Sequence, residues 1–328
     1  MGMNPNERNL EEAISTPSPA LIQMMRRLDG DLLILGVTGR MGFPLALASL
    51  KAIRQAGLAK RVIGAGKFED PPEREKFENY GIETVYCDLL EDRSVNSLPD
   101  CDNVVFMAGR EEDLSGVQAR DWAINTVAIA SAFKRFREAG IVVLSSASVY
   151  PAVPSSSGGS TETDPVRPEG ETAQSMLAKE RLAEYYSISS KTSAAILRLG
   201  NPIDLRYGIL REIGTSVYGG VPIDVSQGFF NAIWLGDAVN QSLLCLEHCS
   251  SPPRILNITG LERLSVRNTA EEFARQFSLD ASLTGKEGPL SPLSNPGIAS
   301  SMLGNPVISN SQMIAWTAEW IKSGGPAL

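Results

Sequence analysis

Three glycines near the start of the chain have the spacing of a diphosphate-binding turn. Residues 31–42 are Asp-Leu-Leu-Ile-Leu-Gly-Val-Thr-Gly-Arg-Met-Gly, so an apolar run leads into Gly36, Gly39 and Gly42. Glycine permits a tight turn and a close approach of the backbone to a pyrophosphate, whose charge then lies at the positive N-terminus of the following helix. A helix predicted over 43–56 completes this context. The segment therefore predicts a dinucleotide-binding site, with an ordinary strand-to-helix turn as the alternative.

Short apolar segments alternate with helical patterns around this turn. Short strands without polar alternation, separated by helices, are typical of a parallel sheet that is covered on both faces. The sequence therefore predicts an α/β fold with a doubly wound parallel sheet of the Rossmann type. The predicted strands are 32–35, 61–63, 84–86, 103–107, 141–144 and 194–197, and the predicted helices are 43–56, 73–80, 122–139 and 172–190.

Beyond residue 200 the alternation loosens, which predicts a smaller, mixed C-terminal region. Here we expect a helix over 236–247, a strand over 254–258, helices over 266–277 and 309–322, and a long irregular loop over 282–306. A Ser- and Gly-rich segment, 151–168, is expected to be a mobile loop beside the site, with a solvated surface loop as an equal alternative. The expected division is a polar leader and short helix in 1–30, a dinucleotide-binding domain in 31–200 to which 229–260 returns, and a substrate-binding region in 201–228 and 261–328.

Composition and charge bear on the partners of the protein. The formal net charge is −8, hydrophobic residues make up 43%, and no basic cluster occurs, so we expect no nucleic-acid partner. No apolar run reaches the about 18–20 residues of a spanning helix, and the N-terminus is polar. We therefore expect no membrane partner and a cytoplasmic location.

Cysteine and histidine usage argues against metal and histidine chemistry. The four cysteines lack the spacing of a disulfide framework. Cys245, His248 and Cys249 could share one helical face, but no fourth ligand is evident and the surrounding leucines indicate a core stripe. His248 is the only histidine, so triads that need one are unsupported. We expect no metal site.

Six further segments carry motifs that, with the glycine loop, match a known superfamily in their order along the chain. They resemble the extended short-chain dehydrogenase/reductase superfamily, in its epimerase/dehydratase branch, which acts on nucleotide sugars and related polyols. The resemblance implies a Rossmann fold, bound NAD(P), a sugar-like small-molecule substrate and a homodimer formed through long helices. The segments are Cys87-Asp88-Leu89, Val105-Phe106-Met107-Ala108-Gly109, Asn125-Thr126-Val127, Ser145-Ser146-Ala147-Ser148-Val149-Tyr150-Pro151, Leu197-Arg198-Leu199-Gly200-Asn201-Pro202 and Trp234-Leu235-Gly236-Asp237-Ala238.

The resemblance also implies a set of cofactor contacts. Besides contacting the cofactor, Asp88 could cap a helix predicted over 91–95, and the two roles are compatible. Asn125 could equally face a helix-packing contact instead of the cofactor. The implied contacts are the glycine loop (Gly36, Thr38, Gly39, Arg40, Met41, Gly42), the adenine segment (Asp88, Leu89), the small residues under the cofactor (Met107, Ala108, Gly109) and the helix residue Asn125.

The end of the second predicted strand bears on the choice between NAD and NADP. An acidic residue there would bind the adenosine ribose and repel a 2′-phosphate. None lies near Gly66, whereas Lys67 and Arg40 could neutralise that phosphate. The sequence therefore favours NADP(H), although Glu69 and Asp70 would reverse this if the strand ended later.

The proton-transfer pair of the superfamily is replaced in this chain. Its Tyr-x-x-Ser-Lys aligns with Thr172-Ala173-Gln174-Ser175-Met176, which places Thr172 on the tyrosine and Met176 on the lysine. A threonine alcohol is far less acidic than a phenol, and methionine carries no charge. Acid–base catalysis is worth about 10²- to 10⁴-fold, which other side chains could supply. The candidates are Lys179, one turn further along, Ser146 on the superfamily's catalytic serine, Tyr150 and Glu171. A functional role is favoured for Ser146 and Tyr150, whereas a solvated helix residue is favoured for Lys179 and a helix-start acid for Glu171.

The substrate-binding candidates begin where the superfamily starts its substrate region. Polar groups and an aromatic ring suit a hydroxylated substrate, whereas turn chemistry at Asn201 and core packing of Trp234 are the alternatives. The predicted set is Ser146, Tyr150, Asn201, Arg206, Tyr207 and Trp234.

Two functions remain open on the sequence alone. The first is an NAD(P)-dependent epimerase, dehydratase or oxidoreductase that acts by hydride transfer on a sugar, sugar acid or nucleotide sugar, with an atypical proton relay. The second is a dinucleotide-binding sensor or scaffold of the same fold that has lost the chemistry. Isomerase or lyase chemistry with a tightly held cofactor cannot be separated from the first by sequence.

Overall fold

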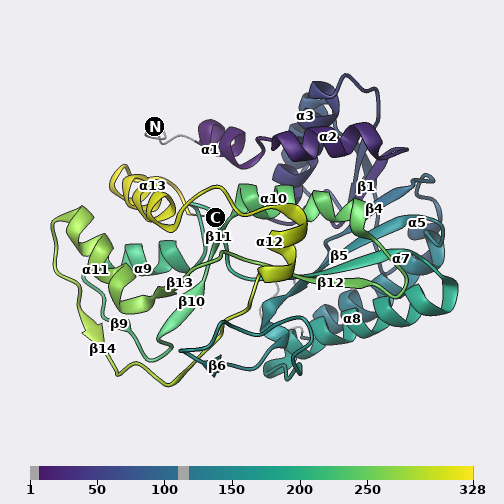
Figure 1. Cartoon of the computed structure of the whole chain (residues 1–328). Helices are drawn as coiled ribbons and strands as arrows, with labels where there is room; N and C mark the ends of the chain where they lie inside the picture. The colour runs from purple at the N-terminus through teal and green to yellow at the C-terminus, as the bar shows by residue number, and fades with distance from the viewer. Residues whose placement is uncertain (1–6, 110–117, 328) are drawn as a thin grey trace.

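The computed structural model describes residues 7–109 and 118–327, and its centre is a seven-stranded parallel sheet (Figure 1). The strand order is β3-β2-β1-β4-β5-β7-β12, and every neighbouring pair is parallel. This confirms the predicted doubly wound α/β fold and most of its strands. Their bounds are β1 (Leu32–Leu35), β2 (Val62–Gly66), β3 (Glu83–Tyr86), β4 (Asn103–Phe106), β5 (Gly140–Ser146), β7 (Ala194–Leu199) and β12 (Arg254–Ile258).

Helices cover both faces of the sheet because successive strand residues point to opposite sides. Leu32 and Ile34 of β1 pack in a core shared with α2 (Pro19–Arg27), α3 (Gly42–Gln55), α4 (Pro71–Tyr80) and α10 (Leu235–Leu244). Leu33 and Leu35 pack in a second core on the other face, shared with three further helices. Figure 1 shows α2, α3 and α10 on one side and α7 and α8 on the other. The second group comprises α5 (Asp92–Asn96), α7 (Ile129–Arg135) and α8 (Gly170–Ser190).

The C-terminal region packs three helices together beside four small two-stranded pairings. Gly214 on α9 has no side chain, and a Cβ there would lie 2.8 Å from Ile321 of α13 and 3.1 Å from Phe273 of α11, so the helices approach closely. The helices are α9 (Ile209–Tyr218), α11 (Val266–Phe277) and α13 (Asn310–Lys322); the strand pairs are β8 (Pro202–Ile203) with β11 (Ile233–Trp234), β10 (Phe229–Asn231) with β13 (Arg263–Ser265), β9 (Ile223–Asp224) with β14 (Leu283–Thr284), and β6 (Val153–Pro154) with β15 (Leu290–Ser291).

Serine caps explain where several helices begin. Ser18 accepts a hydrogen bond from the Leu21 amide at the start of α2, and Ser265 accepts one from the Asn268 amide at the start of α11. Ser309 forms a capping box with Gln312, which starts α13. Each cap satisfies an amide that would otherwise lack a partner in the first turn.

The predicted polar leader was partly wrong, since residues 7–14 form a helix. In α1 (Glu7–Ile14), Leu10 and Ile14 are buried in the first core, and Glu11 forms ion pairs with Lys76 of α4 and with Arg206. Apolar residues four apart lie on one helix face, which buries them despite the charged residues between them. Residues 1–6 of the predicted leader lie outside the described residues.

Two predicted helices are interrupted. The helix predicted over 122–139 consists of α6 (Gln118–Ala123), a π-helical turn η1 (Ile124–Ala128) and α7, which ends at Arg135. The helix predicted over 236–247 ends as α10 at Leu244 and continues as a 3₁₀ turn, η3 (Cys245–His248). Another 3₁₀ turn, η2 (Ala147–Val149), follows β5.

Two predicted loops contain regular structure. Within 282–306 the chain forms β14, β15 and α12 (Gly297–Leu303), because β14 and β15 find partners far away in the sequence. Segment 151–168, predicted to be mobile, contributes β6 to β15, and its Arg167 amide donates to the Val149 carbonyl. Long-range pairing of this kind leaves no local signal, so the prediction of an irregular loop over 282–306 was partly wrong. Segment 151–168 is mainly a loop, as predicted, apart from β6 and a bridge at Ser160.

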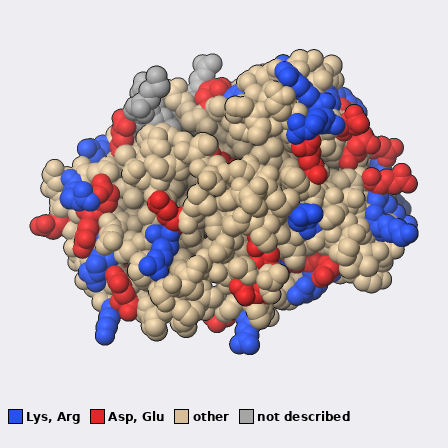
Figure 2. All heavy atoms as spheres, in the orientation of Figure 1, with Lys and Arg blue, Asp and Glu red and all other residues tan. Residues whose placement is uncertain are grey.

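Charged side chains are interspersed on the face drawn in Figure 2, around a broad area of uncharged residues. Acidic and basic groups alternate at the edges of that face, without a patch of one sign. Among residues 7–109 and 118–327, no helix is both long and apolar enough to cross a membrane.

Candidate active site

The glycine loop leaves β1 and enters α3 with no room for side chains at two of its three glycines. A Cβ on Gly36, which has a φ of +81°, would lie 2.7 Å from the Ala108 side chain, and one on Gly42 would lie 1.7 Å from the Val37 carbonyl oxygen. A Cβ on Gly39 would meet only the Gly36 carbonyl, at 3.6 Å. Gly36 and Gly42 are therefore required by the fold, whereas the absent side chain of Gly39 leaves open space over the loop.

This space fits a dinucleotide diphosphate. The α3 helix begins at Gly42, so its first amides and its positive dipole end face the loop. The carboxyl ends of β1 and β4 lie side by side, since Leu35 pairs with Phe106. Open α/β sheets bind ligands at this edge. The loop, with Thr38, Arg40 and Met41 between its glycines, lies at this edge of the sheet.

Residues after β4 lie against the glycine loop on one side and against α8 on the other. Met107, Ala108 and Gly109 are half-buried. A Cβ on Gly109 would lie 3.2 Å from the methyl carbon of Met176 and 3.5 Å from Nζ of Lys179. The structure thus brings together the predicted cofactor segment and two of the predicted catalytic residues.

Asn125 lies on the π-helical turn and is fully buried. Its Nδ2 donates to Ser175 Oγ at 2.9 Å, and Ser175 Oγ donates to the Thr172 carbonyl. The Asn125 Oδ1 atom has no hydrogen-bond partner among the described residues. A buried acceptor without a donor costs about 1–3 kcal/mol, so this oxygen favours a donor from a ligand or water. Single π-helical turns occur often at functional sites.

Lys179 is buried beside the residues that follow β4, so its favoured interpretation as a solvated helix residue was wrong. Its Nζ donates to the carbonyls of Ala108 (2.8 Å) and Leu144 (3.2 Å), near the ends of β4 and β5, and no carboxylate among the described residues forms an ion pair with it. Burial disfavours the ammonium and lowers the pKa of Lys179 to about 7, although the charge of Glu180 acts in the opposite direction. A neutral amine retains two N–H bonds, enough for both carbonyls, and gains a lone pair. Lys179 can therefore change its charge near neutral pH in place.

The stability of the protein should depend on pH through Lys179. Its pKa is about 7 in the folded protein and near 10.5 when exposed, so between these values the unfolded chain binds a proton that the folded chain does not. Stability then rises with pH, by about 1.4 kcal/mol per unit. Between pH 7 and 9, urea unfolding should show the free energy of unfolding of the wild type rising by about 1.4 kcal/mol per pH unit relative to that of Lys179→Met. The exposed Lys134→Met is the control, and parallel curves for wild type and Lys179→Met would refute the argument.

Ser146 and Thr172 carry the hydroxyl groups predicted for the catalytic set. Ser146 lies at the end of β5, half-buried, and its Oγ accepts from the Ser148 amide at 3.1 Å, which leaves its hydroxyl hydrogen available as a donor. Thr172 is half-buried in the first turns of α8. Glu171 beside it is exposed and accepts from the Trp122 indole at 2.6 Å.

Tyr150 is held in a buried polar network and is not accessible as a free phenol. Its hydroxyl accepts from Arg198 (2.6 Å) and donates to Asn257 Oδ1 (2.9 Å), and burial raises its pKa although Arg198 acts against this. Arg198 also binds Glu180, at 2.7 Å between Nη2 and Oε2, and Ser145 donates to Glu180 at 2.6 Å. The network holds Tyr150 beside the end of β5, next to Ser146. Sequence reasoning gave no role to Asn257, which lies 107 residues from Tyr150 and carries no local motif.

The end of β2 holds a charged pair where the adenosine ribose is expected. The strand ends at Gly66, so Lys67 is the next residue, while Glu69 and Asp70 lie further along, before α4. Lys67 Nζ lies 3.0 Å from Asp88 Oδ2. Burial raises the pKa of Asp88, but the Leu90 amide and Lys67 outweigh it and lower the pKa overall. Asp88 does not cap α5, whose N-cap is Glu91, and instead accepts from the Leu90 amide.

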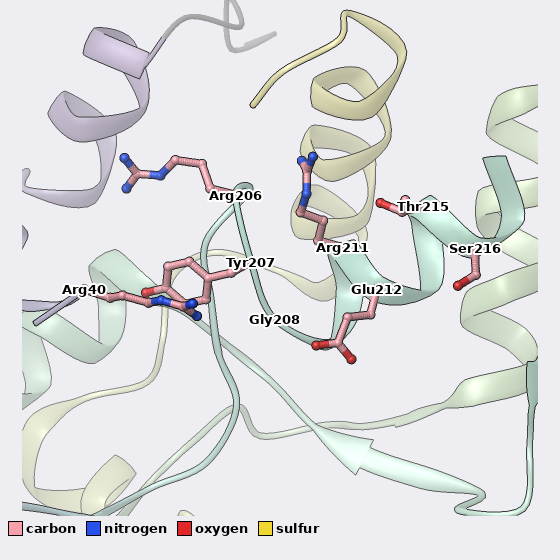
Figure 3. Close-up of a pocket in the computed structure, with 8 residues that line it drawn as sticks. All are labelled: Arg40, Arg206, Tyr207, Gly208, Arg211, Glu212, Thr215 and Ser216. Carbon is pink, nitrogen blue, oxygen red and sulfur yellow. The ribbon is translucent and has the colours of Figure 1, made fainter. Parts of the chain in front are cut away.

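The predicted substrate residues separate into exposed and buried groups. Trp234 is 3% exposed and packs edge-on against Trp316, which makes it part of the core. Asn201 is exposed with a φ of +43°, and its Nδ2 donates to the Asn231 carbonyl. Arg206 is bound by Asp204, and the Arg40 guanidinium lies 4.7 Å from the centre of the Tyr207 ring. Arg40, Arg206 and Tyr207 line a pocket of about 470 Å³ beside the glycine loop (Figure 3).

Known structures share this fold. A dTDP-glucose 4,6-dehydratase from Streptomyces venezuelae, solved with NAD bound, is 18% identical, with a TM-score of 0.75 over 89% of this chain and 97% of that chain. A UDP-glucose 4-epimerase from Thermotoga maritima, solved with UDP-glucose, is 13% identical, with a TM-score of 0.72 over 90% of this chain and 99% of that chain. No curated protein matches the sequence.

Residues 32–206 match the model of the NAD dependent epimerase/dehydratase family. The matched range is more than half of the chain and includes the glycine loop, the residues after β4, the end of β5 and all of the polar network except Asn257. The chain therefore belongs to the NAD-dependent epimerase/dehydratase family.

Proposed function

We propose that this protein is an NAD(P)-dependent epimerase, dehydratase or oxidoreductase that acts on a sugar, sugar acid or nucleotide sugar through an atypical proton relay. The observation that carries the proposal is the meeting of four features at one sheet edge: the open space over Gly39, the unpartnered Asn125 Oδ1, the Ser146 hydroxyl and the buried Lys179. A bound nicotinamide dinucleotide would supply hydride transfer. The chain's own residues must bind it, orient the substrate hydroxyl and move a proton.

Each group has a separate task in this site. The glycine loop and the first amides of α3 bind the diphosphate. Ser146 donates a hydrogen bond that orients the reacting oxygen of the substrate. Lys179 provides a neutral amine near pH 7, which can accept a proton beside Gly109. In this arrangement Thr172 and Met176 shape the site, and the titrating group has moved one helical turn along α8.

The proposal is tested by turnover and by restoring the replaced pair. Purified protein is incubated with NAD⁺ or NADP⁺ and a panel of sugars, sugar acids and nucleotide sugars. Absorbance of reduced nicotinamide reports a net oxidation, and NMR of the products reports a redox-neutral epimerisation or dehydration, in which the cofactor returns the hydride within the same turnover. We expect turnover of at least one compound, and loss of that turnover in Lys179→Met with dinucleotide binding retained. Turnover that survives unchanged in Lys179→Met would reject this relay.

A dinucleotide-binding sensor is the second candidate, and one observation favours it. Thr172 and Met176 put neither a phenol nor an ammonium at the positions where the superfamily that the sequence resembles carries its catalytic pair. A sensor would bind a dinucleotide without turning over any compound in the panel. The double replacement Thr172→Tyr with Met176→Lys would then create activity that the wild type lacks, whereas an enzyme rebuilt around Lys179 should gain nothing from it.

We further propose a preference for NADP(H), set by Lys67. The charged residue that follows β2 is basic, and its partner Asp88 holds it at the strand end. Lys67→Gln should therefore weaken NADP⁺ binding about tenfold or more and change NAD⁺ binding little, since only the former carries a 2′-phosphate. Titration calorimetry with both dinucleotides measures this, with the exposed Lys134→Gln as a control of equal charge change. Equal losses for the two dinucleotides would contradict it.

A further inference from the structure

A cation–π contact joins the glycine loop to the C-terminal region. Arg40 lies in the loop between Gly39 and Met41, and its guanidinium carbon lies 4.7 Å from the centre of the Tyr207 ring. Figure 3 shows the Arg40 side chain reaching that ring. The face of an aromatic ring attracts a cation through its negative potential. The contact therefore ties the loop that is predicted to bind a diphosphate to a residue far away in the sequence.

The turn that carries Tyr207 is held on several sides. Asp204 is fully buried, and its two carboxylate oxygens accept from the Arg206 guanidinium at 3.0 and 2.6 Å and from the Arg206 amide at 2.8 Å. From the following helix, Arg211 donates to the Leu205 carbonyl at 2.9 Å. These bonds leave the backbone of the turn little freedom, so Tyr207 presents its ring from a fixed position.

The N-terminal helix α1 braces the same turn. Glu11 of α1 lies 3.8 Å from Arg206 Nη1 and also pairs with Lys76 of α4, so one carboxylate links the turn to a helix that covers the sheet. Apolar residues of α1 anchor the helix in the first core. The range that matches the family model begins at residue 32, so the family match does not account for this support.

The glycine loop, by contrast, has few bonds of its own to fix its shape. Gly39 and Arg40 are exposed, and Met41, at the N-cap of α3, makes no side-chain hydrogen bond to the first turn of that helix. Glycine gives the backbone the widest conformational freedom, so ordering such a loop around a ligand costs more entropy than ordering other segments. An Arg40 side chain that is held on Tyr207 removes part of this cost before a ligand arrives.

We propose that Tyr207 is a positioning residue of the dinucleotide site, which acts through Arg40 to hold the glycine loop in its binding conformation and thereby slows release of the dinucleotide. This role rests on the proposed function for the presence of a dinucleotide on the loop. It differs from the substrate contact that the sequence predicts for Tyr207. Because the loop must loosen before the diphosphate can leave, the contact should act mainly on the dissociation rate.

The rate of dinucleotide release provides the test. Protein loaded with NADPH or NADH is mixed with a large excess of the oxidised form, and stopped-flow fluorescence of the reduced nicotinamide gives the dissociation rate. We expect Tyr207→Leu to release the dinucleotide about two- to fivefold faster, as the loss of an exposed cation–π contact predicts. Tyr207→Phe keeps the ring face and should retain the wild-type rate. The control is Tyr218→Leu, which replaces an exposed tyrosine at the other end of α9.

A double replacement separates a role through Arg40 from a direct contact between Tyr207 and the dinucleotide. If Tyr207 acts through Arg40, Tyr207→Leu should not change the release rate further in an Arg40→Gln background. Arg40 is exposed, so this background should keep the fold, which circular dichroism checks.

Three results would overturn the proposal. They are a wild-type release rate in Tyr207→Leu, release from Tyr207→Phe as fast as from Tyr207→Leu, and an effect of Tyr207→Leu that persists in the Arg40→Gln background. Failure of both reduced dinucleotides to bind the wild-type protein would instead reject the proposed function, on which this role depends.

Discussion

Replacing Glu180 with glutamine is expected to lower the free energy of unfolding by about 3–5 kcal/mol. Glu180 and Arg198 are each 2% exposed, and three hydrogen bonds of 2.7–3.2 Å join them. Glutamine keeps the shape but removes the charge, which leaves a guanidinium buried without its counterion. The same change weakens the acceptor for Ser145, next to Ser146. Urea unfolding followed by circular dichroism measures the loss.

The neighbouring ion pair on the same helix supplies the control. Arg181 and Glu184 lie 3.0 Å apart but are 56% and 40% exposed, so Glu184→Gln should cost less than about 0.5 kcal/mol. Removing both buried partners, in Glu180→Leu with Arg198→Met, should recover part of the loss because no charge is left buried. If Glu180→Gln costs no more than Glu184→Gln, the network does not hold the end of β5 in place.

The parts of the fold that the sequence predicts are those with a local physical signal. Leu32–Leu35 is apolar throughout because both faces of the sheet are covered, and the glycine turn and the apolar helix that follows it are adjacent in the sequence. The strands β14 and β15 have no such signal, since their partners lie 60 to 140 residues earlier. The helix α1 does carry one, the spacing of Leu10 and Ile14, but it is masked by the charges around it.

The candidate site follows the same division. The glycine loop and the Ser146 strand end are contiguous motifs, so sequence places them without knowledge of the fold. The π-helical turn that holds Asn125 has hydrogen bonds between residues five apart instead of four, and no residue type in Ile124–Ala128 indicates this. Lys179 was named from its spacing on a helix, but its burial against the Ala108 and Leu144 carbonyls depends on how α8 docks on the sheet. Tyr150 and Trp234 were predicted to contact the substrate, but both are buried in the structure. An aromatic residue near a site in the sequence can belong to the core that surrounds the site.

Replacing Gly39 with alanine is expected to abolish most dinucleotide binding and leave the fold intact. The added methyl group would touch only the Gly36 carbonyl, at 3.6 Å, and the backbone there has no positive φ, so the free energy of unfolding should change by less than about 0.5 kcal/mol. The methyl group would occupy the space where the backbone must approach a pyrophosphate. Titration with NAD⁺ and NADP⁺ should show affinities at least tenfold lower, equal to about 1.4 kcal/mol.

Two further glycines separate this effect from a loss of stability. Gly42→Ala would place its Cβ 1.7 Å from the Val37 carbonyl oxygen, so the loop must move, at a cost of about 3 kcal/mol or more. Gly140→Ala, at the opposite end of the sheet and no closer than 3.8 Å to any neighbour, should alter neither stability nor binding. If Gly39→Ala binds both dinucleotides as tightly as Gly140→Ala does, the diphosphate does not lie over this loop. Lys179 and Ser146 would then have no cofactor beside them, and the proposed hydride and proton transfer would be rejected together with the diphosphate site.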